Sequence, residues 1–359
     1  MITPYVKIDF SKVKNNISSM VISLANHHIS HRPHIKPHKS VEFARLQIES
    51  GAIGITCATL TELDVMAKGG IDNILLAIPL IGEDQWNRLY DILSTYSFTF
   101  MIVVDSEIGM NGLAEIGKRL KRPINVLVAI DGGSHREGIQ PENAVDFINK
   151  VVRREWLNFK GLFTYYGQIY QYDYVEQPRK AKDEASILLD VQKRVVAEVR
   201  HFDVLSGGST VSSKYPEQLK GLTESRAGNY IFYDMNAVHL GIAELGQCAL
   251  RVIAKVISIP IEGRATIDAG SKALSTDQPI KGSDYGYIVN KPELRIVKVN
   301  EEHGFIEYDP EKIDVSIGDM IEIIPNHACV IPNLYNQVFL FENDRMIKKI
   351  PVDARGRNY

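Results

Sequence analysis

Residues 99–104 read Thr-Phe-Met-Ile-Val-Val, a short run that is apolar after its first residue. Such a run is typical of a β-strand that is covered on both faces, as in a parallel sheet. About eight runs of this kind alternate with longer helix-patterned stretches, and this number of βα units predicts a (β/α)8 TIM barrel. The runs are residues 33–36, 52–56, 73–78, 99–104, 125–130, 161–165, 203–206 and 230–233.

The pattern changes after about residue 245, where short β-prone runs follow one another without a long helical pattern between them. Turn residues and charges separate these runs, which is typical of an all-β domain. They are residues 251–261, 264–268, 294–300, 304–308, 320–324, 338–341 and 346–352. We therefore expect an α/β barrel domain at residues 9–244 and a smaller all-β domain at residues 245–359, which residues 1–8 could join.

The composition fits a folded protein with a small-molecule partner. Among 359 residues, 45% are hydrophobic and 24% are charged. The net charge of -3 provides no basic field for nucleic acid or an anionic membrane. The most apolar stretch, residues 74–81, contains Pro79 and is shorter than the roughly 20 residues of a membrane-spanning helix. The first residues lack a signal-peptide core and an Arg-rich transit pattern, which predicts a cytoplasmic protein.

A lysine ends the first predicted strand, and the active site of a βα barrel lies beyond the carboxyl ends of its strands. Partial desolvation at the barrel mouth would lower the pKa of Lys36 and make its amine available for a Schiff base. The alternative is an ordinary solvated lysine. Pro33 and Pro37 oppose a helix here, so His34 and His38 are poor candidates for a helical metal pair.

Two glycine-containing segments accompany the seventh and eighth predicted strands. Barrels commonly seat a phosphate in the loops after these strands, because glycines let backbone N–H groups approach an anion closely. Ordinary tight turns are the alternative. The candidate residues are Gly207, Gly208, Ser209 and Thr210 in the first segment and Arg226, Gly228, Asn229 and Tyr230 in the second.

Arg136 and Tyr165 follow the fifth and sixth predicted strands. Arg136 could hold an anionic oxygen, although a surface arginine paired with Glu137 is equally compatible with the sequence. Tyr165 could stack on a planar ligand or hydrogen-bond to it, and core packing is the alternative.

The all-β region contains Pro325-Asn326-His327-Ala328-Cys329. On an extended segment, residues two apart project to the same side, so His327 and Cys329 could bind one metal ion, and imidazole with thiolate favours zinc. A buried cysteine beside a satisfied histidine is the alternative. With only Cys57, Cys248 and Cys329 in the chain, neither a disulfide framework nor a zinc finger is indicated.

Over nearly its whole length the sequence resembles the D-threonine aldolase and D-serine dehydratase family, which belongs to the alanine racemase class of pyridoxal-phosphate enzymes. The segments that carry the resemblance begin with Thr3-Pro4 and Asp9 and continue with PHIKPHK (33–39), GGST (207–210), RAGNYIFYD (226–234), DAGSKALS (268–275), EEHG (301–304), PNHAC (325–329) and ARGR (354–357).

The resemblance implies a role for each candidate residue. Lys36 would carry pyridoxal phosphate as a Schiff base, with Tyr165 beside the ring and Arg136 near its phenolic oxygen. Arg226 resembles the arginine that faces the ring nitrogen in alanine racemase. The phosphate would be held by Gly207, Gly208, Ser209 and Thr210 together with Gly228, Asn229 and Tyr230, and His327 and Cys329 would hold zinc. The resemblance also implies a homodimer in which the β domain of one chain closes the barrel mouth of the other.

The resemblance favours a lyase that eliminates water from a D-3-hydroxy amino acid such as D-serine. Dehydratases of the family resemble this sequence in carrying His-x-Cys, whereas D-threonine aldolases usually carry His-x-Asp. Retro-aldol cleavage to glycine and an aldehyde is the alternative, followed by a racemase or a non-enzymic pyridoxal-phosphate-binding protein. The sequence differs from the common family pattern at Pro37, where threonine is frequent, at Gln168, where histidine is frequent, and at Asn336, where aspartate is usual.

Overall fold

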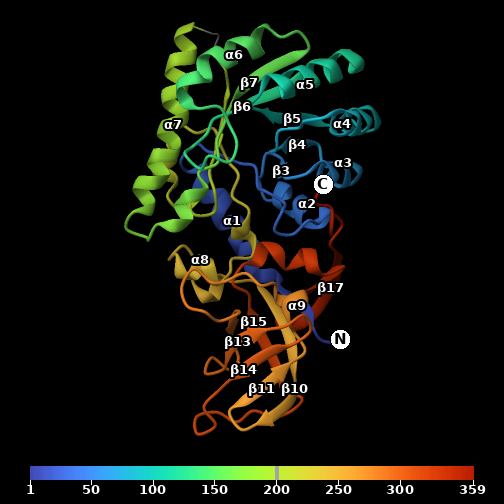
Figure 1. Cartoon of the computed structure of the whole chain (residues 1–359), viewed down its shortest axis with the longest axis vertical. Helices are drawn as coiled ribbons and strands as arrows, with labels where there is room; N and C mark the ends of the chain where they lie inside the picture. Colours follow the sequence, from blue (N-terminus) through green and yellow to red (C-terminus); the bar gives the residue numbers. More distant parts are fainter. Residues whose placement is uncertain (199–201) are drawn as a thin grey trace. The chain divides into compact units, whose positions relative to one another are not determined.

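The computed structural model describes residues 1–198 and 202–359. The chain divides into two compact units (Figure 1). The barrel unit comprises Ser18–Lys36, Val41–Gly228 and Arg357–Tyr359, and the β unit comprises Met1–Ile17, Pro37–Ser40 and Asn229–Gly356. In the described part of the chain, no helix is both long enough and apolar enough to cross a membrane.

Parallel strands form the centre of the barrel unit. Within the described residues its sheet has eight strands in the order β2-β9-β8-β7-β6-β5-β4-β3. A bridge between His34 and Thr56 joins the segment after β2 to β3, so the sheet closes on itself and the predicted barrel is confirmed. The strands are β2 (Ser30–His31), β3 (Ile55–Cys57), β4 (Asn73–Leu76), β5 (Thr99–Val104), β6 (Ile124–Ala129), β7 (Leu157–Phe163), β8 (Val204–Gly207) and β9 (Glu224–Ser225).

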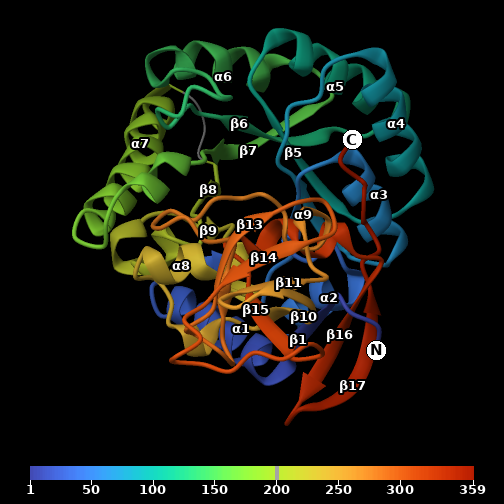
Figure 2. The ribbon, with the colours of Figure 1, turned by 60° about the horizontal axis from the view of Figure 1, so that its bottom comes forward.

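Helices lie outside these strands, as Figure 2 shows for α3 to α7. They are α2 (Val41–Glu49), α3 (Leu60–Lys68), α4 (Glu83–Thr95), α5 (Glu107–Leu120), α6 (Ala144–Arg153) and α7 (Gln177–Glu198). The start of α3 has a local cause, because the Thr59 hydroxyl accepts a hydrogen bond from the N–H of Glu62 and the Glu62 carboxylate accepts one from the N–H of Ala58.

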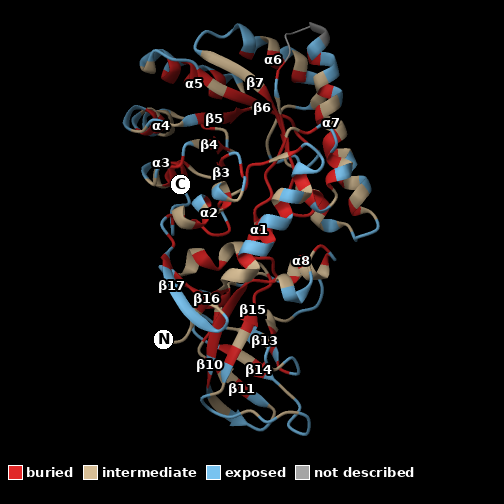
Figure 3. Cartoon of the chain, turned by 180° about the vertical axis from the view of Figure 1, so that it is seen from behind, coloured by how far each residue is buried: buried red, intermediate tan, exposed pale blue. Residues whose placement is uncertain are grey.

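Apolar side chains fill the barrel between the strands. A buried cluster is formed by alternate residues of β4 to β7, namely Leu75, Met101, Val103, Leu127, Ala129 and Phe163. Figure 3 shows buried residues along these strands and exposed residues on the outer helices. Gly161 is required where β7 approaches β8, because its φ is 151° and a Cβ there would lie 1.9 Å from the carbonyl oxygen of Val204. The barrel is thus a packed core whose strand ends are available for a site.

Two of the predicted strands need correction. The eighth strand is Glu224–Ser225, and the predicted run 230–233 instead begins within a 3-10 helix, η5 (Asn229–Ile231). A short apolar run does not distinguish a strand from a buried helical turn, whereas the true strand is polar. The first strand is Ser30–His31, before the predicted start at Pro33, which has no N–H to donate to a sheet.

The β unit is built on mixed strands around the long strand β10. Its sheet, within the described residues, has the order β13-β14-β11-β10-β1-β16-β17, with β15 pairing to β10 and β12. The strands are β1 (Tyr5–Asp9), β10 (Leu250–Ile261), β11 (Arg264–Ile267), β12 (Tyr287–Ile288), β13 (Arg295–Val299), β14 (Gly304–Glu307), β15 (Met320–Ile324), β16 (Gln337–Glu342) and β17 (Arg345–Pro351). The N-terminal strand β1 is antiparallel to β10 and parallel to β16.

One longer helix and several short ones complete the fold. Helix α1 (Phe10–Ala25) has 16 residues and begins in the β unit, where the Asp9 carboxylate caps it by accepting a hydrogen bond from the N–H of Lys12. The short helices are α8 (Met235–His239) and α9 (Ser271–Leu274) with the 3-10 helices η1 (Pro141–Asn143), η2 (Gly167–Gln171), η3 (Ser212–Lys214), η4 (Pro216–Leu219), η6 (Leu245–Gln247), η7 (Ala328–Val330) and η8 (Pro332–Leu334).

Candidate active site

Three residues predicted from separate strand ends come together in the barrel unit. The Lys36 ammonium nitrogen lies 6.0 Å from the centre of the Tyr165 ring, and the Arg136 guanidinium carbon lies 4.7 Å from the same centre. Lys36 itself is exposed, so the expected desolvation by the barrel mouth is not seen in this single chain. The turn that follows β2 leaves its side chain open to solvent.

The loop that carries Arg136 is held by Asp131, which follows β6 and is buried. Its carboxylate accepts hydrogen bonds from the N–H of Gly133 at 2.8 Å, the N–H of His135 at 3.1 Å and the amide of Gln140 at 2.8 Å, and it pairs with the His135 ring at 2.7 Å. Burial alone would raise the pKa of Asp131, but these bonds stabilise the carboxylate and lower it.

The alternative interpretation of Arg136 also has support, because its guanidinium forms an ion pair with the Glu137 carboxylate. The side chain of Arg136 is more than half exposed, so this pair contributes little to stability and can exchange for a ligand anion.

Arg226 is fully enclosed at the ends of β7 and β8. Its guanidinium donates to the Ser206 hydroxyl at 2.7 Å, the Gly207 carbonyl at 3.3 Å and the Thr164 carbonyl at 2.5 Å, and it stacks on the Phe163 ring at 3.8 Å. Burial lowers the pKa of Arg226 to about 10, although nearby carboxylates oppose this shift. The Arg226 guanidinium is therefore a fixed positive charge that contacts Phe163 and Thr164, the two residues that precede Tyr165.

The Gly207–Thr210 turn is buried, and side chains that follow or precede it in the sequence hold its backbone by hydrogen bonds. The N–H of Gly208 donates to the Glu184 carboxylate at 2.8 Å, and the N–H of Ser209 donates to the Ser212 hydroxyl at 2.8 Å. Gly208 has a φ of 80°, and a Cβ there would lie 2.4 Å from the Ser225 hydroxyl oxygen. Glycine is therefore required where β8 ends beside β9.

The second glycine segment crosses from one unit to the other. The Ala227 carbonyl, just before Gly228, accepts a hydrogen bond from the N–H of His34 at 3.2 Å, which ties this segment to the strand that leads to Lys36. Asn229 and Tyr230 belong to the β unit and lie in η5. The Asn229 side-chain oxygen is buried without a hydrogen-bond partner in the described residues.

The predicted metal pair lies in the β unit after β15. His327 is extended, but Cys329 lies in the 3-10 helix η7, so the expectation of a wholly extended segment is wrong. The segment turns because the N–H of Ala328 donates to the buried Asp234 carboxylate at 2.8 Å. Cys329 nevertheless lies close enough to the His327 ring to raise the pKa of that histidine.

Carboxylates surround this pair. The Nδ1 atom of His327 lies 2.9 Å from the Asp277 carboxylate, which leaves Nε2 as the ring nitrogen for a metal ion. Asn326 donates to the carbonyls of Asp277 and Asp284, which fixes the start of the turn. Burial lowers the pKa of His327, but Cys329 and the nearby carboxylates raise it to about 10 overall.

The residues present fit both groups that the sequence predicted. A primary amine beside an aromatic ring and two guanidinium groups suits a planar, anionic aldehyde such as pyridoxal phosphate, and the buried Gln168 side-chain oxygen, unpartnered among the described residues, adds an acceptor near Gly132. Imidazole and thiol suit zinc. Across residues 1–198 and 202–359, no group of three or more His, Cys, Asp or Glu is placed to hold a metal ion.

Sequence reasoning missed the supporting carboxylates. Asp131, Glu184 and Asp277 each contact a candidate residue or its loop. Only Asp131 had a sequence signal, since it directly precedes Gly132-Gly133, a turn in which an aspartate commonly accepts backbone hydrogen bonds. Asp277 lies 50 positions from His327, and nothing local relates them.

Known proteins are similar to this chain over nearly its whole length. Residues 8–235 match the family model described as "Alanine racemase, N-terminal domain", and residues 249–341 match "Putative serine dehydratase domain". A 3-hydroxy-D-aspartate aldolase of Paracoccus denitrificans is 28% identical over 99% of this chain and 93% of its own. A D-serine dehydratase of Dictyostelium discoideum is 29% identical over 96% and 94%.

A solved structure is also similar. The D-threo-3-hydroxyaspartate dehydratase of Delftia sp. HT23 has a TM-score of 0.91 at 26% identity and covers 98% of this chain and 97% of its own. A D-threo-3-hydroxyaspartate dehydratase mutant in the metal-free form is similar to the same degree, with a TM-score of 0.91 at 25% identity over 98% of this chain and 97% of its own.

The chain therefore belongs to the alanine racemase N-terminal domain family, a class of pyridoxal-phosphate enzymes with a barrel fold. Within that class it is a member of the D-serine dehydratase and D-threonine aldolase family, and it is a lyase.

Proposed function

We propose that this enzyme uses pyridoxal phosphate and zinc to eliminate water from a D-3-hydroxy amino acid, with D-serine as the first candidate. The products are a 2-oxo acid and ammonia. The observation that carries the proposal is the convergence of Lys36, Arg136 and Tyr165 in a barrel whose chain also contains the His327–Cys329 pair.

In the proposal the barrel unit holds the cofactor. Lys36 binds it covalently, Tyr165 lies along its ring, Arg136 meets its phenolic oxygen and Arg226 provides a fixed positive charge. The proposed phosphate-binding residues of this unit are Gly207, Gly208, Ser209, Thr210 and Gly228; Asn229 and Tyr230, which the sequence also predicted for the phosphate, belong to the β unit. Pyridoxal phosphate, when bound, withdraws electrons from the Cα atom of the substrate. Once the amino group of the substrate has taken the place of Lys36 on the cofactor, the freed Lys36 amine would be positioned to remove the proton from Cα.

The β unit holds the metal in this proposal. His327 and Cys329 are its two protein ligands, and Asp277 orients the His327 ring through Nδ1. Zinc held there would act as a Lewis acid on the β-hydroxyl group, which is otherwise a poor leaving group. The substrate would lose its α-proton and its β-hydroxyl group as one molecule of water, and a molecule of water would be consumed when its amino group leaves as ammonia.

Aldol cleavage is the second candidate, because the relatives at similar identity include aldolases as well as dehydratases. In that reaction the hydroxyl group loses its proton, the Cα–Cβ bond breaks, and glycine and an aldehyde are formed. Product analysis separates the two. We expect 2-oxo acid and ammonia after incubation of the enzyme with D-serine, D-threonine or a 3-hydroxyaspartate isomer. Formation of glycine and an aldehyde would show that the enzyme is an aldolase and not a dehydratase. Equal conversion of D- and L-serine into one another would indicate a racemase.

We also propose that the enzyme acts as a homodimer, by analogy with alanine-racemase-like enzymes. Sedimentation at micromolar concentration should give the mass of two chains. A fully active monomer would contradict this proposal.

A further inference from the structure

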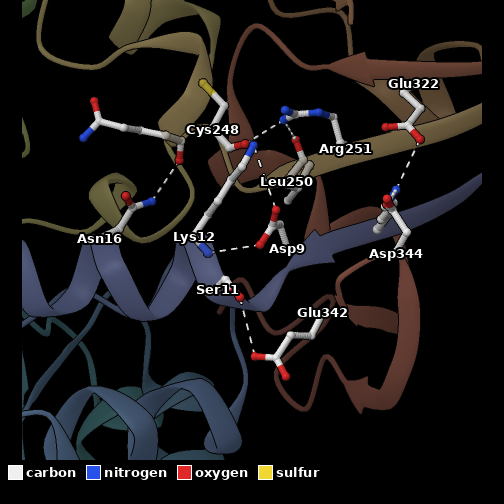
Figure 4. Close-up of polar contacts among 12 residues, drawn as sticks. Asp9, Ser11, Lys12, Asn16, Cys248, Leu250, Arg251, Glu322, Glu342 and Asp344 are labelled. Carbon is white, nitrogen blue, oxygen red and sulfur yellow. Dashed lines mark hydrogen bonds and ion pairs between the residues drawn. The ribbon is translucent and has the colours of Figure 1, made fainter. Parts of the chain in front are cut away.

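A charged pocket in the β unit has no role in the proposed reaction. It has a volume of about 240 Å³ and lies where β1, β10 and β15 meet the first turn of α1. We call it the β1 pocket and define it by its charged residues, Lys7, Asp9, Lys12, Arg251, Glu322 and Asp344 (Figure 4). Neither the lysine of the barrel site nor the His327–Cys329 pair lines it.

Arg251 is the distinctive residue of the β1 pocket. Only 8% of its surface is exposed. One guanidinium nitrogen donates to the carbonyl oxygens of Cys248 at 2.7 Å and Leu250 at 3.2 Å. These are neutral acceptors, and among the described residues no carboxylate forms an ion pair with Arg251. Asp9 and Glu322 lie near enough to favour its charge, but neither pairs with it directly, so the guanidinium keeps N–H groups that can bind an anion.

The Cys248 side chain does not supply that anion. Burial raises the pKa of the Cys248 thiol to about 12, so the group is neutral at physiological pH. The charge of Arg251 therefore stays uncompensated from the side of β10.

Lys12 is a second cation that lines the β1 pocket beside Arg251. The Lys12 ammonium nitrogen lies 4.0 Å from the Asp9 carboxylate, at the limit of an ion pair. Burial lowers the pKa of Lys12, and the positive charge of Arg251 lowers it further. The other Asp9 oxygen caps α1, whose N-terminal end adds partial positive charge. Figure 4 shows Lys12 and Arg251 directed toward one another.

The remaining carboxylates already have a partner. The Lys7 ammonium nitrogen lies 3.2 Å from Glu322 and 3.1 Å from Asp344, and the side chain of Asp344 is 91% exposed. The pocket is therefore lined by three cations and three carboxylates, and the side chains of Asp9, Glu322 and Asp344 are 40%, 33% and 91% exposed. Among these six charged residues Arg251 is the most deeply buried, and it forms no ion pair within the described residues.

We propose that the β1 pocket binds a small oxyanion, either a carboxylate or a phosphate, with two oxygens on the Arg251 guanidinium and one contact to Lys12. The planar guanidinium fork matches a pair of oxygens, and a bound anion removes the repulsion between Arg251 and Lys12. The inference is independent of the proposed reaction, because it uses none of the residues assigned to cofactor or metal.

Titration of the full-length enzyme, loaded with pyridoxal phosphate and metal so that those sites are filled, tests the proposal. Inorganic phosphate and acetate are added separately at constant ionic strength, and binding is followed by calorimetry. We expect saturable binding of one anion per chain, and the tighter of the two identifies the ligand class. Arg251→Gln should abolish binding and Lys12→Gln should weaken it at least about tenfold, since each removes a charge-assisted hydrogen bond.

Lys14→Gln is the matched control. Lys14 lies on the same helix but pairs with Glu342 at 3.0 Å outside the β1 pocket, so its loss should leave anion affinity unchanged. If Arg251→Gln does not fold, the anion affinity of Lys12→Gln still tests the proposal. Absence of saturable binding, or equal affinity in Lys12→Gln and the natural enzyme, would overturn the proposal. An equal loss of anion affinity in Lys12→Gln and Lys14→Gln would show a general effect of net charge and would also overturn the proposal.

A crystal of the unmodified enzyme soaked with selenate gives a direct location. Anomalous scattering should place selenium between Arg251 and Lys12. A carboxylate from a second copy of the chain in that place would show that the pocket is an interface and would refute the proposed ligand.

Discussion

In the barrel unit, the candidate cofactor residues stand at the ends of parallel strands, whereas in the β unit the candidate metal pair stands in a turn after β15. The barrel residues are held mainly by backbone carbonyls and by hydrogen bonds within loops, as Arg226 is held by Thr164 and Gly207, although the Glu184 carboxylate on α7 also accepts a hydrogen bond from Gly208. The metal pair is held by side-chain carboxylates from distant segments, as His327 is held by Asp277. Strand order therefore specifies the first group, and tertiary pairing specifies the second.

The largest effect should come from Lys36→Ala. Because the variant lacks the only amine near Tyr165 that we assign to the cofactor, it should lose covalent pyridoxal phosphate and at least about 10²–10⁴-fold in turnover. Its zinc content should not change if the two units are independent centres. Borohydride reduction and peptide mapping of the unmodified enzyme should find the pyridoxyl group on Lys36.

Lys272→Ala is the control for that experiment, because Lys272 is exposed and pairs with Glu302. It should retain both cofactor and activity. A pyridoxyl group on Lys272 or on Lys39 would refute the assignment of Lys36.

The next largest effect should come from Cys329→Ala. Loss of a ligand should release zinc and raise the barrier to elimination by several kcal/mol, because the hydroxyl group would leave without a Lewis acid. Cofactor absorbance should stay. Metal analysis and 2-oxo acid assays measure both properties. Cys329→Asp keeps a ligand and makes the pair like that of the aldolases, so it should retain metal. Full dehydratase activity in metal-free Cys329→Ala would be incompatible with the proposed role.

Asp277→Asn tests whether a distant carboxylate supports the metal pair, because it changes the partner of the His327 ring without removing a metal ligand. We expect zinc affinity to fall about 10–100-fold, since the His327 ring loses its charged partner. Competition with a chromophoric chelator measures the change without any activity assay. Asp284→Asn serves as the control, because the Asp284 side chain pairs with Arg295 at 2.8 Å. Similar affinities in both variants would mean that Asp277 has no role in metal binding.

The smallest effect should be the change in stability caused by Glu184→Gln, because Glu184 contacts the Gly207–Thr210 turn only through the N–H of Gly208 and the side chain of Ser212. Burial raises the pKa of Glu184 above its ordinary value of 4.5, although the Ser212 and Gly208 hydrogen bonds and the Arg226 charge oppose the shift. The folded state thus favours the protonated form, and stability falls as pH rises from 4.5 through the raised pKa. Glutamine keeps an acceptor for Gly208 and carries no charge.

Thermal unfolding at a series of pH values tests this expectation. At neutral pH the Glu184→Gln variant should be more stable by about 1 kcal/mol, and below pH 4.5 the two proteins should converge. A variant that is less stable at neutral pH would show that the Glu184 charge supports the turn.

The sequence predicted much of the barrel and less of what supports the sites. The run at residues 99–104 coincides with β5 because apolar periodicity is strong there. β9 was missed because it consists of Glu224 and Ser225, whose burial depends on partners such as Arg32 and Ser206. Lys36 and Tyr165 could be proposed as site residues because each follows a strand. The distance between the Lys36 ammonium nitrogen and the Tyr165 ring could not be predicted from the sequence. Asp277 could not be found, since its relation to His327 exists only after folding.

The most direct test of the account removes metal while the cofactor is observed. The enzyme is treated with a chelator, its visible absorbance is recorded, and 2-oxo acid formation from D-serine is measured before and after zinc is restored. The account predicts nearly unchanged cofactor absorbance, loss of 2-oxo acid formation and recovery with zinc, because separate residues hold the two groups. Undiminished formation of pyruvate by the metal-free enzyme would contradict it.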